Sequence, residues 1–242
     1  MMKHTLILLL VLLIGFTNYA QSLNGSWKLV EEYGKEVSDK IVKRIYQDNY
    51  FAETAKDSSS DEFLWALGGE YKPSDYSFLL DFNTKSPEVV GESTEADLEF
   101  TDDDKIEITT DNSTQIWERI SDDNNDLDGN WVITGRKRDG VMNTMKPGDR
   151  RTIKILGGER FQWVAFNSAT KEFYGTGGGT YTAENGVYTE SIDVFSRDKS
   201  RIGASLEFDY ELKDGEWHHS GKSSKGDPIY EIWSKYAKAY KK

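Results

Sequence analysis

Glu190 is the residue whose chemistry stands out most in this sequence. It lies in the alternating stretch from Tyr188 to Val194, in which every second residue faces the same side of a strand. The matching stretch in the first half, from Tyr76 to Phe82, has Phe78 at the same place. A carboxylate on an inward face is costly to bury unless it is paired, and burial is expected to raise its pKa, so such groups are often functional. Glu190 is therefore the leading candidate for ligand binding; the alternatives are an outward face or a buried arginine partner such as Arg160.

His218 and His219 are the two histidines beyond the first twenty residues. Neutral imidazole binds metals and haem iron, so either ring is a conceivable ligand. Adjacent strand residues point to opposite faces, so at most one of the two faces a cavity. No second metal-binding residue type lies at a suitable spacing, and we favour a solvated histidine at a strand end. We retain His218 as a candidate ligand-binding residue and expect no cofactor.

Aromatic side chains supply the apolar surface that a pocket for an apolar or sugar-like ligand needs. Each of them, taken singly, also fits the pattern of an ordinary sheet residue. The candidates are Trp65 and Tyr71 in the first half, and Trp163, Tyr174, Tyr181 and Tyr188 in the second.

The remaining motifs indicate neither catalysis nor ion binding. The run from Asn124 to Gly135 partly resembles a calcium loop, but its twelfth position is Gly instead of Glu, so we interpret its start as a linker. The glycines between 175 and 179 are not followed by the Lys-Ser or Lys-Thr of a phosphate loop, and they indicate a turn or bulge. No Gly-x-Ser-x-Gly elbow occurs, and no carboxylate pair stands out among the 42 acidic residues. We expect binding without catalysis and leave enzymatic activity open.

The elements that position these residues follow from an internal repeat. Leu127 to Ile133, with the sequence Leu-Asp-Gly-Asn-Trp-Val-Ile, repeats Leu23 to Val30 near the start of the chain. The offset between the halves grows along the chain, as expected if insertions fall in loops, and we infer one duplicated β unit. Further matching pairs are Gly68-Gly69-Glu70-Tyr71 with Gly178-Gly179-Thr180-Tyr181, Tyr76 with Tyr188, Gly91-Glu92-Ser93 with Gly203-Ala204-Ser205, and Ile116-Trp117 with Ile232-Trp233.

Short stretches of alternating apolar and polar residues, separated by Gly, Asn, Asp and Ser clusters, run through both halves. Leu206 to Leu212 alternates throughout, so one face of that strand must be buried. Strands of this kind predict an antiparallel sandwich or barrel. The segment from Lys35 to Lys43 differs, because Val37, Ile41 and Val42 are spaced for a helical turn and predict a short helix closing one end of a barrel.

Gly25-x-Trp27 and Gly129-x-Trp131 each open a unit of short strands and resemble the start of the lipocalin-like (calycin) barrel. The tandem is similar to the exported, uncharacterised lipocalin-like domains of the Bacteroidetes type. The resemblance implies an all-β chain of two tandem antiparallel barrels. It also implies that each tryptophan plugs the closed end of its barrel beneath a basic residue of the last strand. Arg119 would then cover Trp27, and Lys235 would cover Trp131.

The resemblance implies a protein that binds a small, apolar or amphipathic ligand in a barrel cavity. The alternative is a structural or protein-interaction module of the cell envelope, with filled barrels. The chain has no cysteine, and so lacks the disulfides common in lipocalins, and each unit is shorter than the usual single barrel. These departures leave open whether either half closes around a cavity.

The first twenty residues have the pattern of a secretory signal peptide. Lys3 precedes an apolar run from Leu6 to Phe16, and Ala20 is a small residue at the expected cleavage site. The run is short for a bilayer span, so we expect cleavage and no integral membrane segment afterwards. Because no cysteine follows Ala20, we expect no lipid anchor. We predict a secreted or periplasmic protein.

The overall charge of the chain limits the partners that it can bind. A net charge of −12 argues against a nucleic-acid partner and against anionic headgroups, while leaving peripheral association with the envelope open.

Residues 122–126 form a linker without an apolar anchor, dividing residues 21–121 from residues 127–242. The basic C-terminal tail with Lys238, Lys241 and Lys242 is expected to be frayed.

Overall fold

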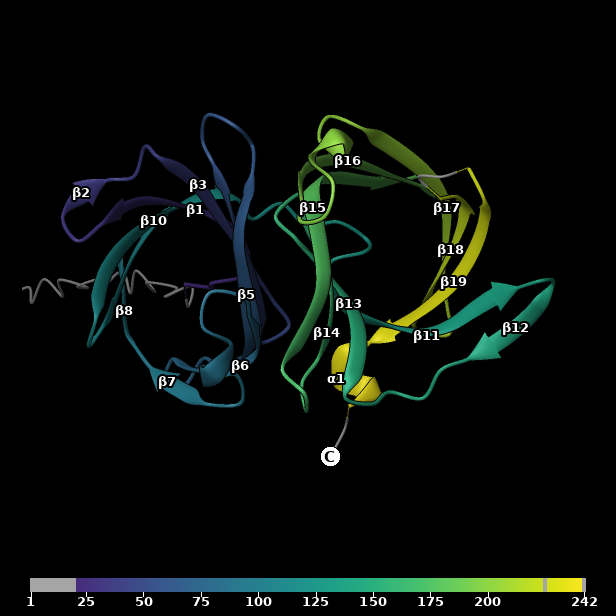
Figure 1. The fold of residues 1–242 in the computed structure, drawn as a ribbon, viewed down its shortest axis with the longest axis horizontal. Helices are drawn as coiled ribbons and strands as arrows, with labels where there is room; N and C mark the ends of the chain where they lie inside the picture. The colour runs from purple at the N-terminus through teal and green to yellow at the C-terminus, as the bar shows by residue number, and fades with distance from the viewer. Residues whose placement is uncertain (1–20, 224–225, 241–242) are drawn as a thin grey trace, which may run out of the picture.

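The structure, a computed structural model, describes residues 21–223 and 226–240, so the predicted signal peptide lies outside the described residues. The described chain forms two antiparallel sheets, each curled into a barrel, one after the other in the sequence (Figure 1). The predicted fold class, all-β with two tandem barrel units, is therefore confirmed. The polar residues 122–126 lie between the last strand of the first sheet and the first strand of the second.

The first barrel is a ten-stranded sheet in the order β7-β6-β5-β4-β3-β1-β10-β9-β8, with β2 paired to β1. It closes through the backbone at Ala96, because β7 pairs with β6 and β8 pairs with β9. Its elements are β1 (Gly25–Glu32), β2 (Lys35–Glu36), β3 (Lys40–Gln47), β4 (Tyr50–Asp57), β5 (Phe63–Lys72), β6 (Ser77–Asn83), the 3-10 turn η1 (Pro87–Val89), β7 (Ser93–Glu95), β8 (Asp97–Asp102), β9 (Lys105–Thr110) and β10 (Ser113–Ser121).

The second barrel is a nine-stranded sheet in which β11 also pairs with β19, so hydrogen bonds close the ring and β12 extends from it. A single strand, β17, pairs with both of its neighbours where the first barrel divides into β7 and β8. The elements are β11 (Gly129–Arg138), β12 (Val141–Thr144), β13 (Arg150–Gly157), β14 (Arg160–Asn167), β15 (Glu172–Glu184), β16 (Val187–Phe195), η2 (Lys199–Arg201), β17 (Ser205–Lys213), β18 (Glu216–Lys222), β19 (Pro228–Lys235) and the helix α1 (Tyr236–Ala239).

The repeat predicted from the sequence is visible in the backbone at two glycines. Gly69 and Gly179 each lie at a register shift in equivalent strand pairs, β5 with β6 and β15 with β16. A Cβ at Gly69 would lie 1.9 Å from the carbonyl oxygen of Leu79, and one at Gly179 would lie 1.8 Å from that of Ser191. Only glycine allows two strand backbones to approach this closely. The glycines between 175 and 179 therefore lie inside one continuous strand, β15, at a bulge instead of a wide turn.

The two barrels pack side by side through the outer faces of β3, β4 and β6 of the first and β13 and β14 of the second. A third apolar cluster lies between them, with Phe82 and Ala52 from the first barrel against Ile153 and Phe166 from the second. Strands at this contact are buried on both faces, because one face lines a barrel and the other meets the neighbouring barrel. Asp81 adds a polar centre, since its carboxylate accepts hydrogen bonds from Tyr50, Arg151 and Tyr236.

Two local predictions were wrong. The predicted helix from Lys35 to Lys43 is replaced by β2 and the start of β3, because β3 completes its hydrogen bonds with β1 and β4. The C-terminal tail is not frayed up to residue 240, since α1 packs at the junction of the barrels with the Tyr236 side chain buried. Arg151 lies over the ring of Tyr240, 4.4 Å from its centroid. The prediction for Lys241 and Lys242 falls outside the described residues.

Candidate functional site

Glu190 lies inside the second barrel and forms a buried ion pair with Lys154. The Lys154 Nζ lies 2.5 Å from Glu190 Oε1, and the Tyr188 hydroxyl donates to the same oxygen at 2.9 Å. The ammonium also lies 5.2 to 5.5 Å from the ring centroids of Tyr188, Trp217 and Trp233. The inward face expected from the alternation is thus observed, but the partner is Lys154 and not the suggested Arg160. Arg160 points outward to Asp193 at the contact between the barrels, at 2.7 Å.

The first barrel contains an equivalent ion pair whose carboxylate comes from a different strand. Arg44 takes the position of Lys154, since the two residues pair with the repeated tryptophans Trp27 and Trp131. Arg44 Nη2 lies 2.6 Å from Glu53 on β4, and its guanidinium lies 4.1 Å over the ring of Trp117.

The second barrel has Trp163 at the position of Glu53, and it has Glu190 at the position of Phe78. The buried cation therefore comes from equivalent strands in the two barrels, β3 and β13. The carboxylate comes from β4 in the first barrel and from β16 in the second. The difference between Glu190 and Phe78 in the sequence is matched by an opposite difference between Trp163 and Glu53.

The inward-facing histidine is His219, which is buried, while His218 faces the other side of β18. His218 Nδ1 lies 2.8 Å from the hydroxyl of Tyr230. The ring centroid of His219 lies 4.2 Å from that of Phe208, and its Nδ1 lies 3.5 Å from Glu231. The expectation of a solvated strand-end histidine was therefore wrong for His219, because β18 places it against the barrel core. Among the described residues, no group of three or more His, Cys, Asp or Glu could hold a metal ion.

Glu231 connects His219 to the rim of the second barrel. Its Oε1 lies 2.6 Å from Arg136 Nη2, and its Oε2 accepts a hydrogen bond from Trp233 Nε1 at 3.2 Å. Burial by itself would raise the pKa of Glu231, but His219, Arg136 and Lys154 together hold it at about 2. The carboxylate is therefore charged at neutral pH, and it neutralises one of the arginines at the barrel mouth.

We expect the stability of the protein to fall as the pH drops below about 6.5, the ordinary pKa of histidine. Burial lowers the pKa of His219 below that range, Lys154 acts in the same direction, and Glu231 offsets only part of the effect. The unfolded chain then binds the proton more readily than the folded chain, so acidification from pH 6.5 towards the lower folded-state pKa favours unfolding.

Urea denaturation at a series of pH values measures this dependence. His219→Ile introduces the residue type of Ile108, which occupies the equivalent position in the first barrel, and should flatten the curve below about pH 6.5. His218→Gln serves as the control and should leave the curve as in the wild type. An unchanged slope in the His219→Ile variant would contradict the assignment.

The repeated tryptophans each lie beneath the basic residue that the resemblance implied. The Arg119 guanidinium lies 4.2 Å from the ring centroid of Trp27, and the Lys235 Nζ lies 4.2 Å from that of Trp131. Both indoles donate to the residue four positions earlier, at 2.8 Å. The two contacts have the same geometry because both units repeat the same strand pairing, β1 with β10 and β11 with β19.

The predicted aromatic residues do not form one cluster, although Tyr181 and Tyr188 lie close together. Tyr181 is buried, and its hydroxyl donates to Asp128. Trp163 is half-buried with its ring centroid 5.6 Å from that of Phe195, and Tyr174 lies beneath Arg150 at 4.8 Å. The structure brings Tyr188 and Tyr181 close to each other, and Tyr188 to Glu190, but it places Tyr174 near the rim. The interior of the second barrel is occupied by a cluster of apolar side chains that contact one another.

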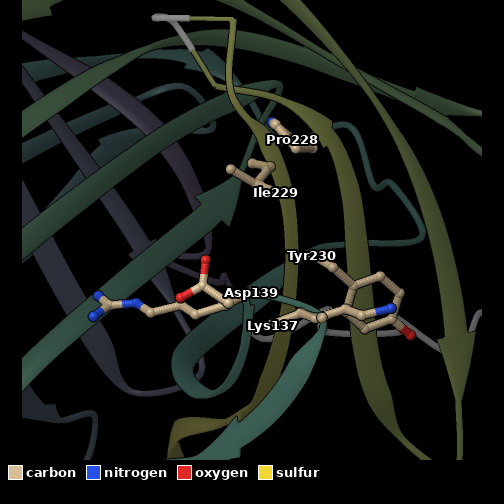
Figure 2. A pocket seen from close by; sticks show the side chains of 7 residues that line it. Lys137, Asp139, Pro228, Ile229 and Tyr230 are labelled. Atoms are coloured by element: carbon tan, nitrogen blue, oxygen red, sulfur yellow. The ribbon is translucent and has the colours of Figure 1, made fainter.

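Three hollows flank the hairpin of β11 and β12, and we call them the hairpin hollows. They have volumes of about 670, 350 and 390 Å³. Figure 2 shows the first, with Lys137 and Asp139 of the hairpin facing Pro228, Ile229 and Tyr230 of β19. The other two share Met145, Lys146 and Pro147. Figure 1 shows this hairpin projecting from the second barrel, on the side away from the first barrel.

None of the six residues predicted to bind a ligand lines the hairpin hollows. Sequence reasoning missed this hairpin, although two signals were present. Met142 and Met145 are the only methionines of the chain apart from Met1 and Met2. Residues 136–151 contain six basic and two acidic residues, in a chain with a net charge of −12. Composition taken over the whole chain hides such a local reversal of charge.

Comparisons with known proteins do not place the chain in a family. No family model matches it, and no curated protein matches it. Among solved structures it is similar to the vaccine antigen transferrin binding protein B from Haemophilus parasuis Hp5, in a tryptophan-to-alanine mutant. The TM-score is 0.23 and the sequence identity is 11%, with 82% of this chain and 61% of that chain covered. In the described part of the chain, no helix is long and apolar enough to cross a membrane.

Proposed function

We propose that the protein is an exported, non-catalytic binding module of the lipocalin-like type, which holds a small amphipathic ligand at the mouth of its second barrel. The observation that carries the proposal is the position of the hairpin hollows, all three of which border the hairpin of β11 and β12. The sequence placed the ligand inside the barrel, around Glu190. Lys154, Tyr188 and neighbouring rings occupy that space, so we assign the ligand to the hairpin hollows instead.

The hairpin offers apolar surface that a ligand of this kind would cover. Met145, which lines two of the hollows, is 37% exposed, and Val141 and Met142 on the same hairpin are 62% and 39% exposed. Methionine side chains are unbranched and polarisable, so they adapt to ligands of different shapes. The hollow next to Tyr240 adds Ile133 and Pro147 to this surface. A ligand bound there would bury apolar area that the isolated chain leaves in water.

Shortening the hairpin should abolish ligand binding without unfolding the barrel. The first barrel supplies the template, because β1 and β2 are joined by the tight turn Tyr33-Gly34 where the second barrel has a longer hairpin. Replacing residues 137–142 by Tyr-Gly would join Arg136 to Asn143 in the same way. Native mass spectrometry after mild purification should detect a small molecule on the wild type and none on the variant.

Two observations would control that experiment. Thermal unfolding of the shortened variant should stay close to that of the wild type, because the replaced residues are exposed. A variant that retains the same ligand as the wild type would contradict the proposal.

A second candidate function is protein interaction at the edge of the sheet. Strand β12 pairs with β11 alone among the described strands, so its other edge has free backbone groups beside exposed Val141 and Met142. An extended segment of a partner could add to such an edge. A purified chain that carries a protein partner and no small molecule would favour this function over the first.

A further inference from the structure

The first barrel contains an ion pair at its rim that the second barrel lacks. Glu32 of β1 lies 2.8 Å from Lys40 of β3, and its other oxygen accepts a hydrogen bond from Gln115 at 3.1 Å. This carboxylate holds β1 and β3 together where their backbones no longer pair, since the β1–β3 ladder ends at Lys28 and Lys43. At the rim of the first barrel, the Glu32 carboxylate therefore joins the two strands through charge-assisted hydrogen bonds.

The strand registers show which residues replace this ion pair in the second barrel. Glu32 pairs with Gln115 in the first barrel, and Arg136 pairs with Glu231 in the second. Lys40 and Arg150 begin the equivalent strands β3 and β13. The carboxylate between the strands has thus become an arginine, opposite another arginine. Arg136 uses Glu231 as its partner, and Arg150 forms no ion pair among the described residues.

The hollow of about 350 Å³ lies at this place and is lined by cations. Arg136, Arg138, Lys146 and Arg150 all contribute to it. Within the described chain, Arg138 and Lys146 form no ion pair, and the Nε of Arg136 is buried without a hydrogen-bond acceptor. A fifth cation, Arg151, is already bound to Asp81 and the Tyr236 hydroxyl. A concave site with several unpaired guanidinium and ammonium groups attracts an anion, and arginine forks match a carboxylate in shape.

Apolar side chains lie beside these cations in the same hollow. Val132, Ile133, Met145 and Pro147 line it together with the ring of Tyr240. The hollow therefore has a positively charged part and an apolar part. This combination suits a molecule with a single carboxylate on an apolar body, and not a bare inorganic anion.

We infer that this hollow binds the carboxylate of an amphipathic ligand, which supplies the negative charge that Glu32 supplies between the equivalent strands of the first barrel. The inference rests on the proposed function and deepens it, because it names the polar group of the ligand and the residues that contact it. Arg150, Arg138 and Lys146 contact the carboxylate, and Arg136 adds a positive charge beside them. The Arg136–Glu231 pair holds the arginine in place at the rim.

The inference is tested with dodecanoate and its neutral analogue dodecanol, each titrated into the full chain by isothermal calorimetry. Dodecanoate should bind at least about tenfold more tightly than dodecanol, because hydrogen bonds to a charged group are stronger than those between neutral groups. Arg150→Gln, a change at an exposed residue, should weaken dodecanoate about tenfold and leave dodecanol unchanged. Lys213→Gln, which removes one exposed cation from the same barrel outside the hollow, should change neither.

A double variant uses the first barrel as its model. Arg136→Glu with Glu231→Gln recreates the Glu32 and Gln115 arrangement beside Arg150, so the chain's own carboxylate should occupy the site. Dodecanoate binding should be lost while dodecanol binding stays. If this variant does not fold, as judged by circular dichroism, the Arg150→Gln result decides.

The outcomes separate the inference from the function on which it rests. Equal affinity for dodecanoate and dodecanol, both lost in the hairpin-shortened variant, would overturn the carboxylate site and support the proposed function. Binding of neither probe to the wild type would overturn both. Undiminished dodecanoate binding by Arg150→Gln would also overturn the carboxylate site.

Discussion

Replacing Lys154 by methionine is expected to lower the free energy of unfolding by about 3–5 kcal/mol. The substitution leaves the Glu190 carboxylate buried in the second barrel without its cation, which lies 2.5 Å away in the native chain. Tyr188 would remain as a hydrogen-bond donor, but a hydroxyl does not neutralise a charge. Urea denaturation at neutral pH, followed by tryptophan fluorescence, measures the loss.

Removing both charges tests whether the loss comes from the unpaired carboxylate. Lys154→Met combined with Glu190→Gln should recover most of the stability, because the introduced amide is neutral and its oxygen can still accept the Tyr188 hydrogen bond. Lys105→Met provides a matched control, since the Lys105–Glu118 pair is exposed and should contribute at most about 1 kcal/mol. A double variant as unstable as the single one would contradict the ion-pair explanation.

Truncating Phe166 to alanine is expected to destabilise the contact between the barrels by about 3–5 kcal/mol. The ring is fully buried, with its centroid 5.2 Å from that of Phe82 on the other barrel. Because the apolar cluster between the barrels draws residues from both, we expect the wild type to unfold in a single calorimetric transition. The variant should unfold at a lower temperature, and its barrels should separate into two transitions if the contact is what couples them.

A double-mutant cycle identifies the contact that is responsible. Phe166→Ala and Phe82→Ala should be non-additive by about 0.5–1.5 kcal/mol, the range for an aromatic pair. Phe208→Ala lies inside the second barrel and makes a control pair with Phe82→Ala, whose effects should add. Full additivity of Phe166→Ala and Phe82→Ala would show that the two rings do not act as a pair.

The sequence predicted the architecture because the information for it is local. The repeated Gly-x-Trp motifs and the period-2 alternation of stretches such as Leu206 to Leu212 depend on neighbouring residues alone. The exception from Lys35 to Lys43 shows the limit of this approach. Val37, Ile41 and Val42 have a helical spacing, but Ile41 and Val42 lie in strand β3. This strand forms because it pairs with β1 and β4, whose positions depend on residues elsewhere in the chain.

The candidate site was harder to predict, since it depends on which residues meet across the sheet. The contrast between Glu190 and Phe78 pointed to a special position, but the partner, Lys154, lies on β13 and is not a neighbour in the sequence. The compensating change from Glu53 to Trp163 is recognisable only when the strand registers are known. The same holds for Arg136 and Arg150, whose relation to Glu32 and Lys40 is recognisable only from the equivalent ladders.

The sequence by itself determined an all-β chain of two related units, because strand periodicity and a duplicated motif are properties of short segments. Only the tertiary structure decided that the second barrel closes by hydrogen bonds, that Lys154 neutralises Glu190, and that the barrels bury Phe82 against Phe166. It also decided that the hollows gather at the hairpin of β11 and β12. The physical reason is that burial, pairing of charges and concavity arise between strands that are distant in the chain, where no local pattern records them.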